Sequence, residues 1–211
     1  ETSEVTCGVC IYFSDDKFFS SSVNLKHSHA ENIFEIIDWL FKISKIRPED
    51  LDNVAISSGP GSFTGLRIGM SAAKGIAYGS GLPVITVPTY DAFAMQISQL
   101  LLNESQFIIA NKVNKDEVYF AKFQIRANSY IFVDDLMVLK NYLFKTKVND
   151  VPVFGNAALL LNENVKIPFS PYPKFVAKWA FEFGEKNKTF EYDFLEPNYL
   201  KNFIVKEKSK W

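Results

Sequence analysis

The sequence predicts an α/β fold of two similar halves, of which the second is abbreviated. Two β-meander patterns, over residues 5–25 and 107–133, are each followed by a helical pattern and then by a short apolar strand. Residues 53–58 are such a strand, because a brief apolar run between turn signals is typical of a buried parallel strand. Repetition of one pattern indicates a duplication. We place the boundary near residues 103–105, between an N-terminal half of residues 1–103 and a C-terminal half of residues 104–211.

In the first half, apolar and polar residues alternate over 5–13 and 17–25, which predicts two strands. Apolar residues at helical spacing predict a helix over 30–46, and Ser28 with Glu31 forms a capping box at its start. A strand over 53–58, a helix over 64–78, a strand over 83–87 and a helix over 90–102 complete this half. The pattern is a meander followed by βαβα units.

The second half begins with strand patterns over 107–110, 118–125 and 130–133. A helix is expected from residue 135, and a further strand over 151–154. The second half therefore repeats the order of the first with fewer helices.

The composition indicates a globular protein with a substantial core. The chain has 211 residues, of which 47% are hydrophobic, and it contains 20 Phe. Its 23 basic and 24 acidic residues give a net charge of −1, so no overall field would attract nucleic acid or an anionic membrane. No signal-peptide pattern and no apolar run of about 18 residues is present, which predicts a cytoplasmic location. A strand pattern starts immediately, so we expect a few native residues, forming an edge or central strand, before Glu1.

Two pairs of potential metal or redox ligands are interpreted as structural. Cys7 and Cys10 are three residues apart in a strand and therefore point to opposite faces. Two thiols are also too few for a zinc site. His27 and His29 have no nearby Asp and are expected to be exposed at a strand-to-helix junction. We therefore expect no metal site.

The stretch GPGSFTGLRIG, residues 59–69, is the most informative in the chain. Gly59 and Gly61 can adopt positive φ angles, and Pro60 between them has a fixed φ and no N–H group, so the chain can reverse tightly. Ser62 or Thr64 then caps the next helix. Such a turn between a buried strand and a helix builds either a phosphate cradle or a docking surface.

Two common motifs are excluded at this turn. A Walker A loop requires Lys and then Ser or Thr after its last glycine, but Leu66 and Arg67 follow Gly65. A nucleophile elbow requires glycine two positions before the serine, and Pro60 stands there before Ser62.

The helix after the turn carries one ridge that is almost free of side chains. Gly65, Gly69, Ala73 and Ala77 recur every four residues. Each helical glycine costs about 1 kcal/mol relative to alanine, so a close neighbour must compensate. That neighbour is either the helix's own sheet or a partner, and the adjacent turn favours a partner.

The helix over 30–46 has more apolar surface than one sheet can cover. Its apolar residues occupy well over half of the circumference, and they are Ile33, Phe34, Ile36, Ile37, Trp39, Leu40, Phe41, Ile43 and Ile46. The surplus predicts contact with another chain. The predicted partner interface consists of Ile33, Phe34, Ile37, Leu40, Phe41, Gly65, Gly69, Ala73 and Ala77.

Several motifs together resemble the bacterial TsaB/YeaZ family of tRNA threonylcarbamoyladenosine biosynthesis proteins. The central stretch 59–69 is close to the family signature, and Glu1-Thr2-Ser3 resembles its opening segment. His29 with the apolar helix that follows, residues 116–119, and the Glu-Pro-Asn-Tyr-Leu-Lys segment 196–201 resemble further family motifs. The resemblance implies an actin-like, Hsp70-like ATPase fold made of two ribonuclease-H-like halves.

The resemblance also implies a function. Members of this family are non-catalytic subunits that bind the related catalytic subunit TsaD, joined by the ATPase TsaE, in a complex that forms threonylcarbamoyl-adenosine beside the tRNA anticodon. Pairing uses the first two helices, with TsaD or with a second copy when the subunit is alone. tRNA is contacted only through the complex, and no membrane is involved.

The turn would then be a vestigial phosphate loop, made of Gly59, Pro60, Gly61, Ser62, Thr64, Gly65 and Arg67. The resemblance aligns Thr89 and Phe93 with two histidines that hold the metal of the catalytic relative, and neither residue can replace them. Glu1 stands where Asp is more usual, and no lysine is near the turn. The chain alone is therefore expected to hold no cofactor, and ATP or ADP would lie at the partner interface.

Two other classes of function remain open at this point. One is an enzyme, either a nucleotide-dependent phosphotransferase or a peptidase-like member of the same superfamily. The other is a self-contained homodimeric binding protein. An enzyme would require an acid, base or metal cluster that these residues do not supply.

Overall fold

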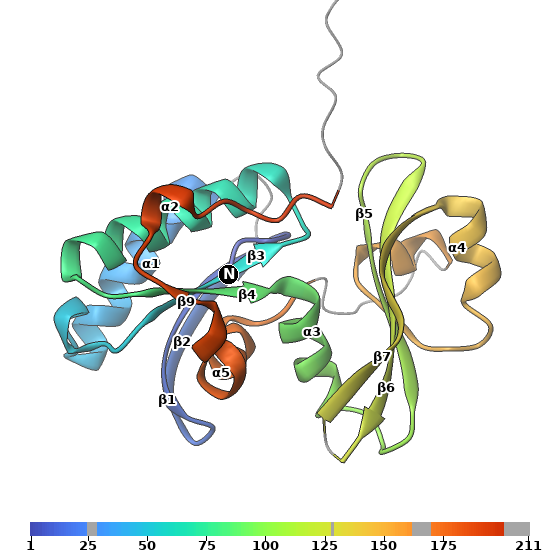
Figure 1. Ribbon diagram of the computed structural model, residues 1–211, viewed down its shortest axis with the longest axis horizontal. Coiled ribbons are helices and arrows are strands. Elements are labelled where there is room, and N and C mark those ends of the chain that lie inside the picture. Colours follow the sequence, from blue (N-terminus) through green and yellow to red (C-terminus); the bar gives the residue numbers. More distant parts are fainter. Residues whose placement is uncertain (25–28, 128, 162–169, 201–211) are drawn as a thin grey trace, which may run out of the picture.

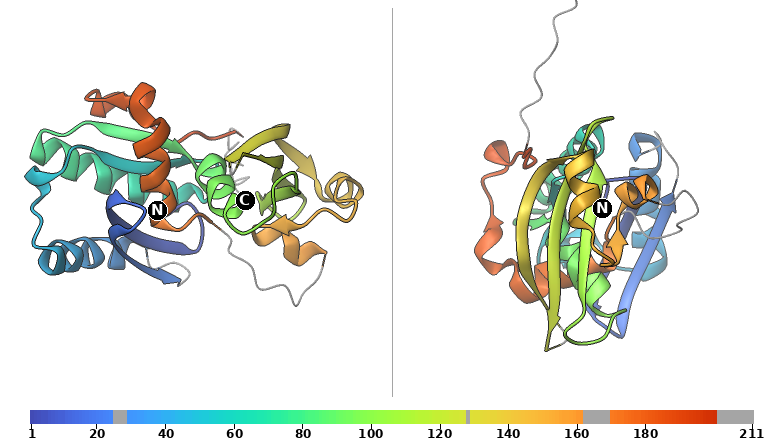
Figure 2. Two further views of the ribbon diagram at one scale, coloured as in Figure 1. Left: turned by 90° about the horizontal axis from the view of Figure 1, so that it is seen from below. Right: turned by 90° about the vertical axis from the view of Figure 1, so that its right-hand side faces the viewer.

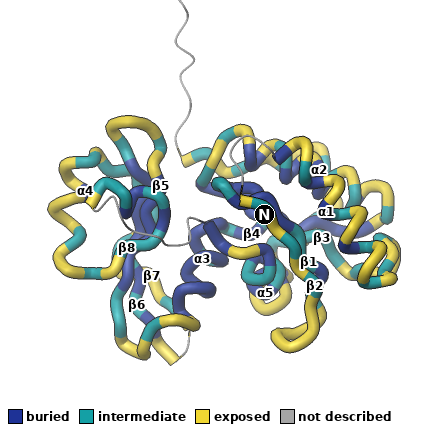
Figure 3. The backbone as a smooth tube through the Cα atoms, turned by 180° about the vertical axis from the view of Figure 1, so that it is seen from behind, coloured by how far each residue is buried: buried dark blue, intermediate teal, exposed yellow. Residues whose placement is uncertain are grey.

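The computed structural model describes residues 1–24, 29–127, 129–161 and 170–200, which form two bodies side by side (Figure 1). Helix α3 (Thr89–Ser98) lies between them, and Figure 2 shows the same arrangement from below. Nine of the ten residues of α3 are buried, all except Asp91, and its tube in Figure 3 is mostly dark. Tyr90, Phe93, Ala94 and Ile97 pack in the core of the second body, and Ala92 and Met95 pack in that of the first, so the helix joins the two bodies. In the described part of the chain, no helix has the length and apolar composition needed to span a bilayer.

The first body contains two small sheets. Strands β1 (Thr6–Ser14) and β2 (Lys17–Asn24) form an antiparallel hairpin in which Thr6 lies opposite Asn24. Strands β3 (Val54–Gly59) and β4 (Val84–Pro88) are parallel, and β9 (Lys188–Thr189) pairs antiparallel with β4.

Helices cover both faces of the first body. Helices α1 (His29–Ser44) and α2 (Phe63–Ser80) cover one face, and α5 (Pro173–Phe183) covers the other. The alternation of β3 and β4 produces this division, because Ile56 and Val84 pack beneath α2 while Ile85 and Val87 pack against α5. A strand buried on both faces is largely apolar, as the run of Val54, Ala55 and Ile56 in β3 indicated.

The second body is a four-stranded sheet in the order β7-β6-β5-β8. Strands β5 (Gln106–Lys112), β6 (Glu117–Arg126) and β7 (Ser129–Lys140) form an antiparallel meander, and β8 (Val153–Phe154) lies parallel to β5. Helix α4 (Asn141–Lys147) covers one face through Phe144, and α3 covers the other. Short 3-10 turns, η1 (Pro48–Asp50), η2 (Asn156–Leu160), η3 (Gly184–Asn187) and η4 (Tyr192–Phe194), complete the elements.

The helix expected from residue 135 starts only at Asn141, as α4, because β7 continues to Lys140 with Met137 and Leu139 on one face and Leu136 and Val138 on the other. The segment after residue 170 was assigned to the C-terminal half. Helix α5 instead buries Val176, Trp179 and Ala180 against Ile85 and Val87 of β4. The residues of the expected capping box include Ser28, which lies outside the described residues.

Candidate functional site

The Gly-Pro-Gly turn connects β3 to α2 and is enclosed by two distant segments of the same chain. Gly59 has a φ of 115°, a conformation that favours glycine. A Cβ atom on Gly59 would lie 2.6 Å from the carbonyl oxygen of Asn198, and one on Gly61 would lie 2.3 Å from that of Ser3. Both glycines are therefore required by the close approach of the chain itself, from its N-terminal segment and from its C-terminal segment.

Three N–H groups of the turn are bound within the chain. The N–H of Gly59 donates to Thr89 Oγ1 at 3.0 Å, and that of Ser62 donates to the Ser3 carbonyl oxygen at 2.6 Å. The N–H of Gly65 donates to Ser62 Oγ at 3.2 Å, which makes Ser62 the N-cap, one of the two caps expected. Pro60 has no N–H. A phosphate cradle needs N–H groups that are free to face a ligand, and these three are already bound.

The C-terminal segment contacts Arg67, which belongs to the stretch 59–69. The Arg67 Nε atom donates to the hydroxyl of Tyr199 at 3.1 Å, and its guanidinium lies 3.9 Å from the centre of the Phe63 ring. The rings of Phe63 and Tyr199 lie 5.0 Å apart. In the same segment, the N–H of Asn198 donates to the Ser58 carbonyl oxygen at 2.6 Å. Arg67 is thus part of an aromatic clasp that holds the C-terminal segment over the turn.

A cleft of about 340 Å³ lies beside the N-terminus of α2, where the two bodies meet. It is lined by Glu4, Gly61, Ser62, Phe63, Thr64, Lys112, Val113 and Tyr119. A hydrogen bond of 2.9 Å from Asn156 Nδ2 to Glu4 Oε2 joins the bodies at this cleft. The Asn156 side chain is itself fixed, because its Oδ1 accepts from the N–H of Lys112 at 2.6 Å.

The carboxyl group of Glu4 is neutral over most of the physiological range. Burial raises the pKa of Glu4 to about 8, the negative charge of Glu1 acts in the same direction, and the hydrogen bond from Asn156 acts against them. The side chain of Glu1 accepts hydrogen bonds from the N–H and hydroxyl of Ser3 and from the hydroxyl of Ser57. Glu1 and Glu4, the acidic residues nearest the turn, therefore both form hydrogen bonds within the chain.

Comparisons with known proteins identify the family. A family model described as TsaD, tRNA N6-adenosine threonylcarbamoyltransferase, matches residues 23–170. Over 96% of each protein, the chain is 26% identical to the tRNA threonylcarbamoyladenosine biosynthesis protein TsaB of Buchnera aphidicola subsp. Acyrthosiphon pisum. It is 31% identical to the protein of that name from Haemophilus influenzae, over 58% of this chain and about half (51%) of the relative. The chain belongs to the TsaB/YeaZ family.

A solved structure of YeaZ from Pseudomonas aeruginosa has the same fold. It superimposes with a TM-score of 0.77 at 21% sequence identity, covering 94% of this chain and 96% of that chain. The mixed α/β architecture of the chain is therefore the architecture of YeaZ.

In this TsaB/YeaZ member, the two positions aligned with metal-binding histidines are part of the core. Thr89 and Phe93 are both fully buried. The Thr89 hydroxyl accepts from Gly59, and Phe93 packs in the cluster around Phe107 and Phe123. Within the described residues, no group of three or more His, Cys, Asp and Glu side chains could hold a metal ion.

His29 is not exposed as expected. It is buried, and its Nε2 atom lies 2.8 Å from the Glu4 carbonyl oxygen. The histidine therefore fixes the start of α1 to the segment that leads into β1. His27 lies outside the described residues.

The structure corrects the prediction that the ridge of Gly65, Gly69, Ala73 and Ala77 faces a partner. A Cβ atom on Gly65 would lie 2.1 Å from the Thr2 carbonyl oxygen, and one on Gly69 would lie 2.2 Å from Thr2 Oγ1. Ala73 and Ala77 are buried in the cluster around Ile56 and Val84. The ridge packs on the helix's own body, which is the alternative that the sequence left open.

A second small ridge of α2 faces outward. Ser71, Gly75 and Gly79 share the four-residue spacing, and all three are exposed. A Cβ atom on Gly75 or Gly79 would meet nothing within 4 Å. This outer ridge was missed although its spacing is visible in the sequence, because spacing alone does not show which face of a helix meets the sheet.

Helix α1 divides the other predicted interface residues between core and surface. Ile33 and Leu40 are buried, so they cannot contact a partner. Phe34 is 59% exposed, and Ile37 and Phe41 are partly buried beside Ile68 of α2. Trp39, at 51% exposed, and Ile43 lie on the opposite flank of the helix. The expectation of an apolar surplus on this helix is confirmed.

Two alanine substitutions in α2 distinguish its buried ridge from its outer ridge. We expect Gly65→Ala to lower the free energy of unfolding by about 3 kcal/mol or more, because the new methyl group would meet the Thr2 backbone. Gly75→Ala is the matched control, and it should raise stability by up to about 1 kcal/mol through helix propensity. Urea denaturation measures both. Equal effects of the two substitutions would contradict the assignment of the ridges.

The raised pKa of Glu4 predicts that stability falls as pH rises. The carboxyl group binds its proton more tightly in the folded chain, so the stabilisation is complete below the ordinary pKa of 4.5 and is lost towards pH 8. We expect the free energy of unfolding to fall by a few kcal/mol between pH 5 and pH 8. Glu4→Gln keeps an acceptor for Asn156 and should remove most of this dependence. An unchanged pH profile in this variant would show that other groups cause it.

Substitutions of Tyr199 test whether its ring or its hydroxyl anchors the C-terminal segment. Tyr199→Ala removes the contacts with Phe63 and Arg67 and should cost about 1–2 kcal/mol. Tyr199→Phe loses only an exposed hydrogen bond and should change stability by about 0.5 kcal/mol or less. Guanidinium denaturation compares the two. If Tyr199→Phe were as costly as Tyr199→Ala, the hydroxyl would be the anchor.

Proposed function

We propose that the chain is a non-catalytic scaffold subunit of the complex that forms threonylcarbamoyl-adenosine beside the tRNA anticodon. In this proposal it binds the catalytic subunit TsaD together with the ATPase TsaE, and it contacts tRNA only through them. Membership of the TsaB/YeaZ family supports a role in this tRNA modification, since the relatives carry the name of the biosynthesis pathway. We also infer that the two bodies are the two ribonuclease-H-like halves of an actin-like fold.

The observation that carries the docking role is the outer surface of α1 and α2. Phe34 is 59% exposed, and it lies three and seven residues from Ile37 and Phe41 on the flank that faces α2. Gly75 and Gly79 of the outer ridge lie open on α2. We call Phe34, Ile37, Phe41, Ser71, Gly75 and Gly79 the helical surface. It combines bulky apolar groups with a ridge that another helix can approach closely.

The geometry of the turn favours a scaffold over a nucleotide-dependent enzyme. Three of the turn's N–H groups are bound within the chain. Thr89 and Phe93 supply no metal ligand, and both are needed by the core. A nucleotide at the cleft beside α2 would therefore need further binding groups from a partner. We place ATP or ADP at the interface between this chain and that partner. Micromolar binding of ATP and magnesium by the isolated chain, with turnover, would favour the enzyme.

The alternative of a self-contained homodimer uses the same surface. A second copy would cover Phe34 and the outer ridge when TsaD is absent. The two proposals differ in outcome when TsaD is added, because a scaffold exchanges its second copy for TsaD and a self-contained dimer does not. Light scattering of the mixture separates them.

A single exposed phenylalanine tests the docking surface. We expect Phe34→Glu to reduce co-purification with TsaD at least tenfold, because it places a charge in an apolar contact. The same variant should lower threonylcarbamoyl-adenosine formation on unmodified tRNA by the reconstituted proteins. Phe34 is mostly exposed, so the chain should remain folded.

Tyr142→Glu is the matched control, because Tyr142 is 68% exposed and lies on α4 of the second body, which is not part of the helical surface. This variant should bind TsaD as the original chain does. Equal binding by both variants would remove the helical surface from the interface. Full modification activity in the complete absence of the chain would overturn the proposed function itself.

A further inference from the structure

The outer edge of the hairpin in the first body is an unpaired strand. Among the strands that the structure describes, β2 pairs only with β1, so its other edge presents backbone groups that no strand meets. Such an edge is a template for another strand, and proteins commonly protect it with charged residues, proline or bulges. An edge without these protections is suited to pairing.

The register of the hairpin shows which backbone groups face the open edge. Gly8 exchanges hydrogen bonds of 2.9 and 2.8 Å with Glu1, on the side of β1 away from β2. Opposite residues of an antiparallel pair either exchange both bonds or neither. Ser22 lies opposite Gly8, so the N–H and C=O groups of Ser22 point to the open edge. By alternation, those of Ser20 and Phe18 do the same.

The outer strand of the second body is protected, and β2 is not. Strand β7 is an unpaired edge of its sheet, and it carries Asp134 and Asp135 in its middle. Its register with β6 also shifts on both sides of Lys122. In β2 the one charged residue is Lys17 at its start. Residues 18–24 contain no proline, and their register with β1 has no shift.

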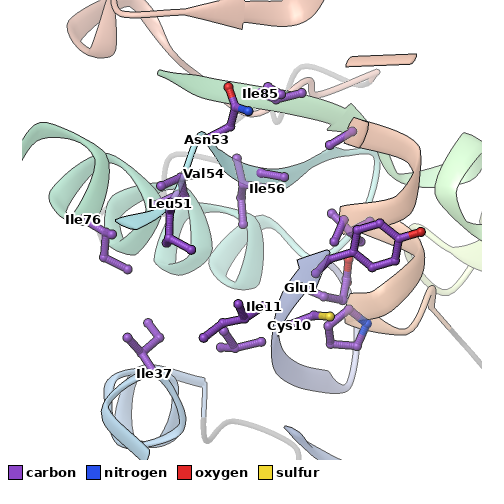
Figure 4. Close-up of a pocket in the computed structure, with 18 of the residues that line it drawn as sticks. Glu1, Cys10, Ile11, Ile37, Leu51, Asn53, Val54, Ile56, Ile76 and Ile85 are labelled. Carbon is purple, nitrogen blue, oxygen red and sulfur yellow. The ribbon is translucent and has the colours of Figure 1, made fainter. Parts of the chain in front are cut away.

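Helix α1 adds an apolar flank beside this edge. The helix packs on both strands of the hairpin, because its buried residues share one hydrophobic cluster with residues of β1 and β2. Ile37 points into the cavity on the inner side of β1, as Ile11 does (Figure 4). Trp39 and Ile43, which are 51% and 44% exposed, lie on the opposite flank of the helix. They are therefore on the side of the open edge.

The spacing of these elements fits two copies of the chain. Antiparallel pairing of β2 with the β2 of a second copy has a two-fold axis perpendicular to the sheet, so both α1 helices lie on one face. Because α1 covers both strands of the hairpin, the two helices would be about two strand spacings, or about 10 Å, apart. Packed helices lie about 8–10 Å apart. Trp39 and Ile43 of the two copies would fill the space between them.

The charges of α1 also fit a second copy. Glu31 is in the first turn of the helix and Lys42 in its last turn, and both are exposed. The two-fold axis makes the two helices antiparallel, so the acidic start of each lies beside the basic end of the other. A second copy therefore matches this edge in backbone pattern, apolar flank and charge.

We propose that β2 pairs antiparallel with the β2 of a second copy, so that the two hairpins form one continuous sheet. Ser21 lies at the two-fold axis, which pairs every residue of the stretch 18–24 with a residue of the other copy. In this register Phe19 lies opposite Val23, on the face that α1 covers. An aromatic side chain opposite a β-branched one is a favourable cross-strand pair.

This contact leaves the helical surface free. The helical surface lies on α2 and on the flank of α1 that faces α2, whereas the β2 edge lies beyond the opposite flank. One copy can therefore hold TsaD and a second copy at the same time. The proposal is independent of the proposed function, because it depends only on contacts between two copies of this chain.

Sedimentation equilibrium of the chain carrying Phe34→Glu tests the proposal, because this background removes association through the helical surface. We expect Ser22→Pro to raise the dissociation constant of the dimer at least tenfold, since it removes an N–H group that faces the open edge. Trp39→Glu, which places a charge in the apolar flank, should have the same effect. Ser22→Ala keeps the N–H group and is the matched control, with an unchanged dissociation constant.

Amide exchange gives a second readout at the edge itself. Exchange of the amide hydrogens of Phe18, Ser20 and Ser22 should slow as the concentration of the Phe34→Glu chain rises, and Trp39→Glu should abolish this dependence. A Phe34→Glu chain that stays monomeric at every concentration would overturn the proposal. A dimer that Ser22→Pro and Trp39→Glu both leave intact would also overturn it, because the contact would then lie elsewhere.

Discussion

The packing of the first three residues beneath α2 is the contact on which the rest of the first body depends. Thr2 lies against the two glycines of the buried ridge, and its hydroxyl donates to the Gly65 carbonyl oxygen at 2.8 Å. Ser3 accepts from Ser62 at the turn, and Glu1 bonds to Gly8 of β1 and Ser57 of β3. Three residues thus join two sheets, a turn and a helix. Glycine is required in α2 because no side chain fits between the helix and this segment.

This contact also decides what the turn can do. With the N-terminal segment on one side and Asn198 on the other, the turn is a packed junction, and three of its backbone donors bind the chain itself. Because the buried ridge packs α2 closely on the first body, the outer ridge on the opposite side of the helix stays exposed. The surface that is left for a partner is therefore the outer face of α1 and α2. The stretch 59–69 contributes by holding α2 in position.

Much of the fold could be predicted from local patterns, and what could not be predicted depends on distant contacts. The order from β1 to α3 follows from alternation, helical spacing and the turn at Gly59. The extent of β7 was missed because Asp134 and Asp135 interrupt its apolar pattern, while pairing with β6 maintains the strand. The return of α5 to the first body depends on contacts of Trp179 with residues more than 80 positions away.

The orientation of the small ridges of α2 could not be predicted from their spacing. The spacing of Gly65 and Gly69 correctly indicated a close neighbour, but only the structure shows that Thr2 is that neighbour. Thr89 was considered only as a lost metal ligand, and its hydrogen bond to Gly59 could not be inferred from a single sequence. The surplus apolar face of α1 was the reliable signal, because burial by one sheet has a geometric limit.

The central claim is that the signature turn is an internal junction and that the helical surface meets the partner. Hydrogen–deuterium exchange of the chain, free and bound to TsaD, tests it directly. The account predicts slower exchange on binding in peptides that cover residues 34–43 and 71–79, and unchanged exchange across residues 59–65. Protection confined to residues 59–65, with α1 and the outer ridge unchanged, would contradict it.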